Sequence, residues 1–155
     1  MEKGDFVPDV TFECADGSRG SLTAYRGAPL VVYFYPKDDT PGCTTEAKDF
    51  SALAADFAKI GVPIVGVSKD TTASHTKFSK KHGLAVELVS DTDGSVCEAL
   101  GVWVEKSMYG KSYMGIERAT FLIDAQGTVA EAWRKVKVKG HAESVLASAR
   151  SLMTT

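Results

Sequence analysis

A continuous apolar run at residues 30–35 constrains the fold of this chain more than any other segment. Six consecutive apolar residues, most of them β-branched or aromatic, are typical of a strand buried on both faces of a parallel sheet. Pro36 ends the run, and apolar residues then recur at helical spacing through about Ile60, where Gly61 is expected to stop the helix. A buried strand followed by a helix is half of a β-α-β unit, so we expect an α/β fold with a parallel core.

The rest of the chain alternates strands and helices in the same way. Segments 10–13 and 20–22 flank an Asp16-Gly17 turn and predict an N-terminal β-hairpin. We expect further strands at 63–67 and near 86–89, helices at 72–82 and just before Gly101, a hairpin of 118–123 and 129–133, and a closing helix at 141–152. A length of 155 residues, 44% of them hydrophobic, without a visible linker predicts one domain spanning residues 1–155.

One cysteine stands at the start of the first long helix. Thr40 is expected to cap this helix and Pro41 suits its first position, so Cys43 falls on the third. A free thiol has a pKa of about 8.5, and a helix N-terminus contributes about 0.3–2 kcal/mol, which corresponds to about one pKa unit. A fixed cation is therefore expected beside the sulfur. The best candidate is Arg118, which opens the apolar run RATFLID.

These residues resemble the active-site pattern of a known family. Pro36, Thr40 and Cys43 form P-x-x-x-T-x-x-C, and with the downstream segment GIERATFLID they resemble peroxiredoxins. The segments YFYPKDDTPGCTTE, GVSKDTTASHTKF, LVSDTDGSVCEALGVW, EKSMYGK and WRKVKVKGHA narrow the resemblance to the bacterioferritin comigratory protein, or PrxQ, subfamily, over nearly the whole chain. The resemblance implies a thioredoxin-like fold of the peroxiredoxin type, with the N-terminal hairpin as an extension. It also implies reduction of hydrogen peroxide and organic hydroperoxides, with recycling by thioredoxin or a similar thiol donor and with no cofactor.

The resemblance also assigns roles to individual side chains. The Cys43 thiolate attacks one peroxide oxygen, releases water or an alcohol and becomes sulfenic acid. The Thr40 hydroxyl binds the thiolate and the peroxide, and Pro36 shields the sulfur from water. Most of the acceleration is expected from donors that face the departing oxygen, namely the Arg118 guanidinium, the Thr40 hydroxyl and the Cys43 backbone N–H. We interpret Glu46 as a first-turn acid favoured by the helix dipole, with positioning of Arg118 as a second hypothesis.

Recycling departs from the subfamily pattern. The resemblance places a resolving cysteine five residues after Cys43 or on the next helix, where this chain has Lys48 and Ser79. Three explanations stay open. In the first, Ser79 is an engineered replacement of a cysteine. In the second, the protein is a one-cysteine enzyme that an external thiol reduces. In the third, Cys97 resolves the sulfenate after a rearrangement.

For the other polar and aromatic residues, we consider a structural role first. Cys14 and Cys97 are expected to be inert and buried. The three histidines are too scattered for a metal site and are expected on the solvated surface: His75, His82 and His141. A basic segment is expected on the outer face of an edge strand, with docking of an acidic reductant as the alternative: Arg134, Lys135, Lys137 and Lys139. An apolar group forms either a flap near the thiol or part of the core: Trp103, Met108, Tyr109, Tyr113 and Met114.

Composition excludes several other classes of function. A net charge of −2, from 18 basic and 20 acidic side chains, gives no reason to bind nucleic acid or an anionic membrane. The N-terminus has no apolar signal region and no segment approaches a membrane span, so we expect a soluble, cytoplasmic protein. Three cysteines without a CxxC motif argue against both a secreted disulfide framework and a thiol–disulfide exchanger. A peroxide sensor or an exchanger on a thioredoxin fold remains the alternative function, and the resemblance favours a monomer.

Overall fold

The structure is a computed structural model that describes residues 1–154. The first half of the chain contains β1 (Thr11–Glu13), β2 (Arg19–Ser21), the 3-10 helix η1 (Leu22–Tyr25), β3 (Leu30–Phe34), α1 (Pro41–Lys59), β4 (Ile64–Ser68) and α2 (Thr72–His82). The second half contains β5 (Glu87–Ser90), α3 (Ser95–Ala99), β6 (Trp103–Met108), β7 (Lys111–Ile116), β8 (Ala119–Ile123), β9 (Val129–Trp133) and α4 (His141–Met153).

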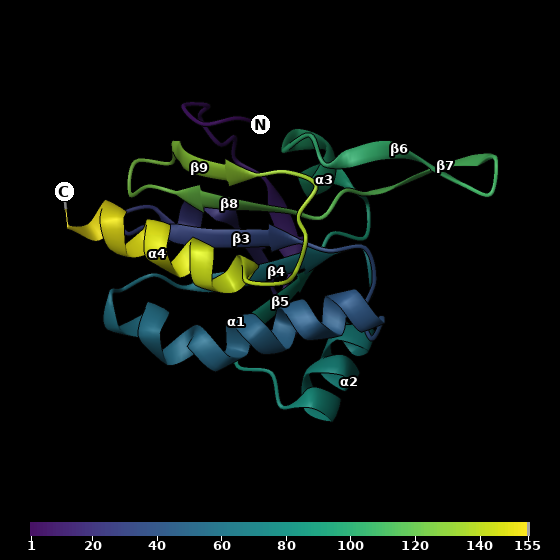
Figure 1. The fold of residues 1–155 in the computed structure, drawn as a ribbon, viewed down its shortest axis with the longest axis horizontal. Helices are drawn as coiled ribbons and strands as arrows, with labels where there is room; N and C mark the ends of the chain where they lie inside the picture. The colour runs from purple at the N-terminus through teal and green to yellow at the C-terminus, as the bar shows by residue number, and fades with distance from the viewer. Residues whose placement is uncertain (155) are drawn as a thin grey trace.

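Seven strands form one mixed sheet in the order β2-β1-β5-β4-β3-β8-β9. The central strands β3, β4 and β5 are parallel, and β8 runs antiparallel to β3. On the other side of the sheet, β1 pairs antiparallel with both β5 and β2. Helices α1 and α4 lie side by side over one face of the sheet (Figure 1), and α2 packs against β5. The predicted α/β, thioredoxin-like fold with a parallel core is confirmed.

The sheet has a hydrophobic core on each face. Successive side chains of a strand point to opposite faces, so Val31 and Tyr33 pack beneath α1 and α4, whereas Val32 and Phe34 pack on the other face. All five residues of β3 are buried, as the continuous apolar run predicted. Because β3 is a central strand and the loop after it leads into α1, the residues of this loop start from a rigid part of the sheet.

Two segments differ from their predicted structure. Residues 103–116 form a separate two-stranded ribbon, β6 and β7, that projects away from the sheet (Figure 1). The basic segment is not an edge strand, because β9 ends at Trp133 and Lys135 adopts a left-handed conformation with φ 48°. Arg134 instead pairs with Glu117 at 2.6 Å. None of the helices within residues 1–154 combines the length and apolar character that a membrane crossing requires.

Candidate functional site around Cys43

Cys43 lies in the first turn of α1, after the loop that follows β3. Thr40 is extended (φ −95°, ψ 155°) and Pro41 is the first residue of the helix, so Cys43 is the third. The N–H groups of a first helical turn have no carbonyl partner inside the helix and carry partial positive charge. Cys43 is 1% exposed and packs in the core beneath α1 and α4. The helix start therefore holds the thiol among donors while excluding most of the solvent.

Arg118 reaches the same place from the next strand of the sheet. It directly precedes β8, whose residue Ala119 pairs with Phe34 at the end of β3. Arg118 Nη2 donates to Cys43 Sγ at 3.4 Å, and Nη1 donates to Glu46 Oε1 at 2.7 Å. Burial tends to lower the pKa of Arg118, but the charges of Glu46 and Cys43 outweigh it and raise that pKa. A fixed cation thus contacts the sulfur, as the sequence suggested it should.

Glu46 is a buried carboxylate and not a first-turn acid. It lies beyond the first turn of α1 and is 1% exposed, so that interpretation is wrong. Its Oε1 accepts from Arg118, while its Oε2 has no hydrogen-bond partner in the protein. Burial raises the pKa of Glu46 to about 7, against the lowering effect of Arg118. The carboxylate therefore fixes one nitrogen of the guanidinium and leaves the other directed at Cys43.

Gly42 is a component of the site that sequence reasoning missed. A Cβ atom at this position would lie 3.1 Å from Arg118 Nη2, which is tighter than ordinary van der Waals contact. A side chain here would push the guanidinium away from the sulfur. A glycine in the second position of a helix was the available signal, because glycine weakens a helix and needs another reason to be there.

Thr40 and Pro36 lie on the loop between β3 and α1. Thr40 is the N-cap residue of α1, as predicted, but its hydroxyl donates to the Lys37 carbonyl at 2.8 Å and makes no capping bond, so only the expected side-chain bond is wrong. Its carbonyl accepts the first helical bond, from the Thr44 N–H at 2.8 Å. Pro36 is exposed two residues after the end of β3. Both residues belong to the loop that leads to Cys43, and their chemical roles remain predictions.

The other cysteines lie away from Cys43. Cys97 is fully buried in the core on the opposite face of the sheet, and Cys14 packs against that same core. Burial, together with the neighbouring Asp91, raises the pKa of Cys97, so its thiol stays protonated. Lys48 is exposed on α1, and Ser79 is half-buried on α2 in a hollow of about 670 Å³ that Cys14 also lines. All three cysteines are free.

The prediction that the histidines lie on the surface is wrong for two of the three. His75 is 1% exposed and His141 is 7% exposed. His141 Nε2 lies 2.7 Å from the Thr120 hydroxyl, and the ring packs edge-on against Phe50 and Trp133. Burial, with a smaller contribution from the charge of Arg118, lowers the pKa of His141 to about 4. His82 is half-buried and pairs with Asp39 at 2.9 Å.

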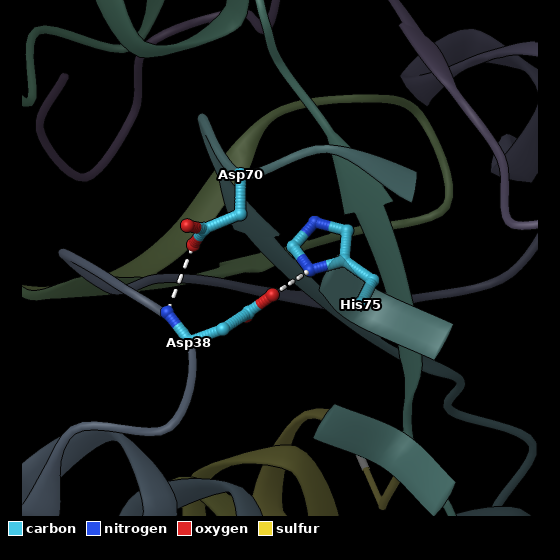
Figure 2. Close-up of side chains that lie close together, drawn as sticks. All are labelled: Asp38, Asp70 and His75. Carbon is cyan, nitrogen blue, oxygen red and sulfur yellow. Dashed lines mark hydrogen bonds and ion pairs between the residues drawn. The ribbon is translucent and has the colours of Figure 1, made fainter. Parts of the chain in front are cut away.

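His75 belongs to a second polar cluster, with Asp38 and Asp70 (Figure 2). His75 Nδ1 lies 2.7 Å from Asp38 Oδ2, and the Asp38 N–H donates to Asp70 Oδ2 at 2.8 Å. The three residues bring potential ligand atoms within 4.8 Å of one another, close enough for a metal ion. However, His75 Nε2 faces the Val89 carbonyl at 2.9 Å and Nδ1 faces the Asp38 carboxyl group, so both ring nitrogens already have hydrogen-bond partners within the protein. The cluster fits a hydrogen-bonded network better than a metal site.

Known proteins resemble this chain in sequence and in structure. The AhpC/TSA family profile matches residues 3–132. Peroxiredoxin Bcp of Xanthomonas campestris pv. campestris is 52% identical over 143 residues, covering 92% of this chain and 89% of the relative. Peroxiredoxin Bcp of Bacillus subtilis is 45% identical over 152 residues, covering 98% and 97%. A solved structure of Xylella fastidiosa PrxQ, a cysteine-to-serine mutant, has a TM-score of 0.92 at 41% identity and covers 97% of this chain and 96% of that chain.

Proposed function

This chain belongs to the AhpC/TSA family and is a peroxiredoxin of the Bcp, or PrxQ, group, and from that premise we propose which residues perform its thiol peroxidase reaction. Cys43 is the peroxidatic residue. The observation that carries this proposal is the contact of Arg118 with both Cys43 Sγ and Glu46 Oε1. Of the three cysteines, all within residues 1–154, only Cys43 lies at the start of a helix in contact with a cation.

The reaction follows from this arrangement. The Cys43 thiolate attacks the terminal oxygen of a hydroperoxide, so that an S–O bond forms as the O–O bond breaks. The sulfur is oxidised to sulfenic acid, and the departing oxygen takes a proton to leave as water or an alcohol. Negative charge develops on that oxygen, and the Arg118 guanidinium and the Cys43 N–H are the donors that stabilise it.

The loop residues complete the proposed site. The Thr40 hydroxyl, which donates to Lys37 in the unliganded loop, turns to the peroxide when the substrate binds. We also propose that Pro36, an exposed residue of the same loop, shields the sulfur from bulk water. The substrates we propose are hydrogen peroxide and organic hydroperoxides. This class of substrate is supported by a relative, the bacterioferritin comigratory protein of Xanthomonas campestris, whose solved structure was described in terms of alkyl peroxide reduction activity. That protein is 51% identical to this chain, and the match covers 93% of this chain.

We propose that recycling uses a thiol from outside the chain. Lys48 and Ser79 cannot form a disulfide, and Cys97 lies on the opposite face of the sheet from Cys43. We therefore propose that thioredoxin or a similar donor reduces the sulfenate directly. We also propose that the protein is a monomer. Engineering of Ser79 from a cysteine stays the alternative. Three free cysteines suit a reducing compartment such as the cytoplasm.

Trapping of the sulfenic acid tests the proposal. One equivalent of peroxide followed by dimedone should label Cys43, as read by peptide mass spectrometry, and Cys43→Ser should abolish peroxide consumption. Cys14→Ser, which removes the half-buried cysteine, is the matched control and should leave both unchanged. Label on Cys14 or Cys97, or continued consumption by Cys43→Ser, would remove Cys43 from the reaction. Sustained turnover with thioredoxin and its reductase would separate a peroxidase from a sensor.

A further inference from the structure

The loop that leads to Cys43 is tied to α2 through two consecutive aspartates. Asp38 is 7% exposed, and its carboxylate accepts from the Tyr35 hydroxyl at 2.6 Å and from the Ser74 hydroxyl at 2.7 Å. The same carboxylate lies 2.7 Å from His75 Nδ1 (Figure 2). Ser74 and His75 belong to the first turns of α2. Asp38 is therefore held by α2 and by the end of β3 together.

Both ring nitrogens of His75 have hydrogen-bond partners. Nδ1 faces the Asp38 carboxylate and Nε2 faces the Val89 carbonyl, at 2.7 and 2.9 Å, and both of those atoms can only accept. Burial alone would raise the pKa of Asp38, but the hydrogen bonds from His75 and Tyr35 outweigh it and lower that pKa. Asp38 and His75 thus form a buried ion pair, and their other polar atoms have hydrogen-bond partners in the protein. Truncation of either residue leaves the other buried without its partner.

Asp39 adds a second connection, to the other end of α2. Its carboxylate contacts Lys81 Nζ at 2.7 Å and His82 Nε2 at 2.9 Å. Its backbone has φ 59°, a left-handed conformation that aspartate adopts more readily than most residues. Two adjacent loop residues are therefore bonded to the first and last turns of one helix, which fixes both the position and the direction of the loop.

This connection leads directly to the reacting atoms. Thr40 follows Asp39, its hydroxyl bonds back to Lys37, and its carbonyl accepts the first bond of α1. The place where α1 begins sets the direction of the Cys43 N–H. We propose that the buried ion pair of Asp38 and His75 positions the loop so that the Thr40 hydroxyl and the Cys43 N–H face the peroxide. His75 acts through Asp38 and touches no reacting atom. This inference rests on the proposed peroxidase reaction.

The test compares two reactions of the same thiol. Peroxide needs the oriented donors, whereas alkylation by iodoacetamide needs only an accessible thiolate. In His75→Gln and Asp38→Asn, the rate constant for sulfenate formation should fall by about ten- to a hundredfold, because small displacements of positioned groups have effects of that size. Alkylation should change much less. The double variant should be no slower than the slower single variant, since both changes break one pair. Thr76→Ala removes an exposed hydroxyl that bonds only within α2 and should match the wild type.

Milder variants keep the test decisive if the charge variants fail to fold. Tyr35→Phe and Ser74→Ala each remove one neutral donor to Asp38 and keep the ion pair. Each should slow sulfenate formation by less than His75→Gln does, because one hydrogen bond is lost and the pair remains, without a matching change in alkylation. Wild-type rates with peroxide in folded variants, or equal losses in both reactions, would overturn the inference. Failure of the wild type itself to form a sulfenate at Cys43 would instead overturn the proposed function.

Discussion

Replacement of Glu46 by glutamine tests the electrostatics of the site most directly. The carboxyl has a pKa of about 7 in the folded protein against an ordinary value of 4.5, because it is buried with one oxygen unpaired. The folded protein therefore binds a proton that the unfolded chain releases between these two values. The contribution of Glu46 to stability must fall as the pH rises through this window and must then level off.

The size of the effect follows from the same two values. Each pKa unit corresponds to about 1.4 kcal/mol, so the change from 4.5 to about 7 corresponds to about 3 kcal/mol. Glu46→Gln removes the titrating group and keeps an oxygen that accepts from Arg118. The variant should therefore gain about 3 kcal/mol relative to the wild type between pH 4.5 and pH 7.5. Its absolute stability at high pH also includes the loss of the ion pair between Glu46 and Arg118.

Urea unfolding at four pH values across the window, in the presence of a reductant, provides the measurement. The informative quantity is the difference in unfolding free energy between variant and wild type at each pH, because contributions of other groups cancel. Glu105→Gln replaces an exposed glutamate on β6 and supplies the baseline. A difference for Glu46→Gln that stays constant across the window would refute the reasoning and show that the carboxylate is charged throughout. Peroxide reactivity should fall less than in Glu46→Ala, which frees the guanidinium.

Three further predictions address neighbouring groups. Arg118→Ala should remain folded by circular dichroism but lose about 10²- to 10³-fold in the rate constant with peroxide, the loss typical of a removed transition-state donor; near-normal activity would exclude Arg118 from the site. Ser79→Cys should form a disulfide with Cys43 after peroxide treatment and support thioredoxin-dependent turnover, as mass spectrometry and a coupled assay would show; a bridge from Cys43 to Cys97 in the unaltered chain would contradict this. His141, whose pKa is lowered to about 4, should make the wild type more stable as the pH rises from 4 to 6.5, because the folded state holds the neutral ring; His141→Asn should lose that dependence in thermal unfolding.

Local signals in the sequence predicted the elements that surround the site. The prediction for α2, residues 72–82, matches the structure, because Gly83 ends the helix in a left-handed conformation with φ 60°. The Thr71 hydroxyl accepts from the Ser74 N–H and caps its start. The buried strands could be predicted because burial on both faces leaves an uninterrupted apolar run. These are properties of a few adjacent residues, which a single sequence displays.

Contacts between distant residues could not be predicted with the same certainty. Asp38 and His75 are 37 positions apart, and Glu46 and Arg118 are 72 positions apart. Polar residues are mostly exposed, so His75 was assigned to the surface; its burial depends on a carboxylate that another part of the chain supplies. Phe78, one turn after His75 on the same helical face, was the available local sign that this face is buried.

The β6 and β7 ribbon was not predicted because of its exposure, whereas His75 was assigned wrongly because of its burial. Its outer half is exposed on both faces, so the alternation that reveals a half-buried strand is absent. The turn at Tyr109 and Gly110, with φ 52° and 78°, suits a two-residue hairpin, but tyrosine is an unusual residue there.

The same ribbon offers a practical opportunity. Tyr109 is 97% exposed, and the strand ends beside it, Met108 and Lys111, contribute nothing to either core. Loop tips of this kind accept foreign peptide more readily than the segments that build a core. A short epitope or fluorophore-binding tag inserted between Tyr109 and Gly110 would leave the seven-stranded body intact. Such a handle would allow immobilisation or imaging of the protein without adding a fourth cysteine.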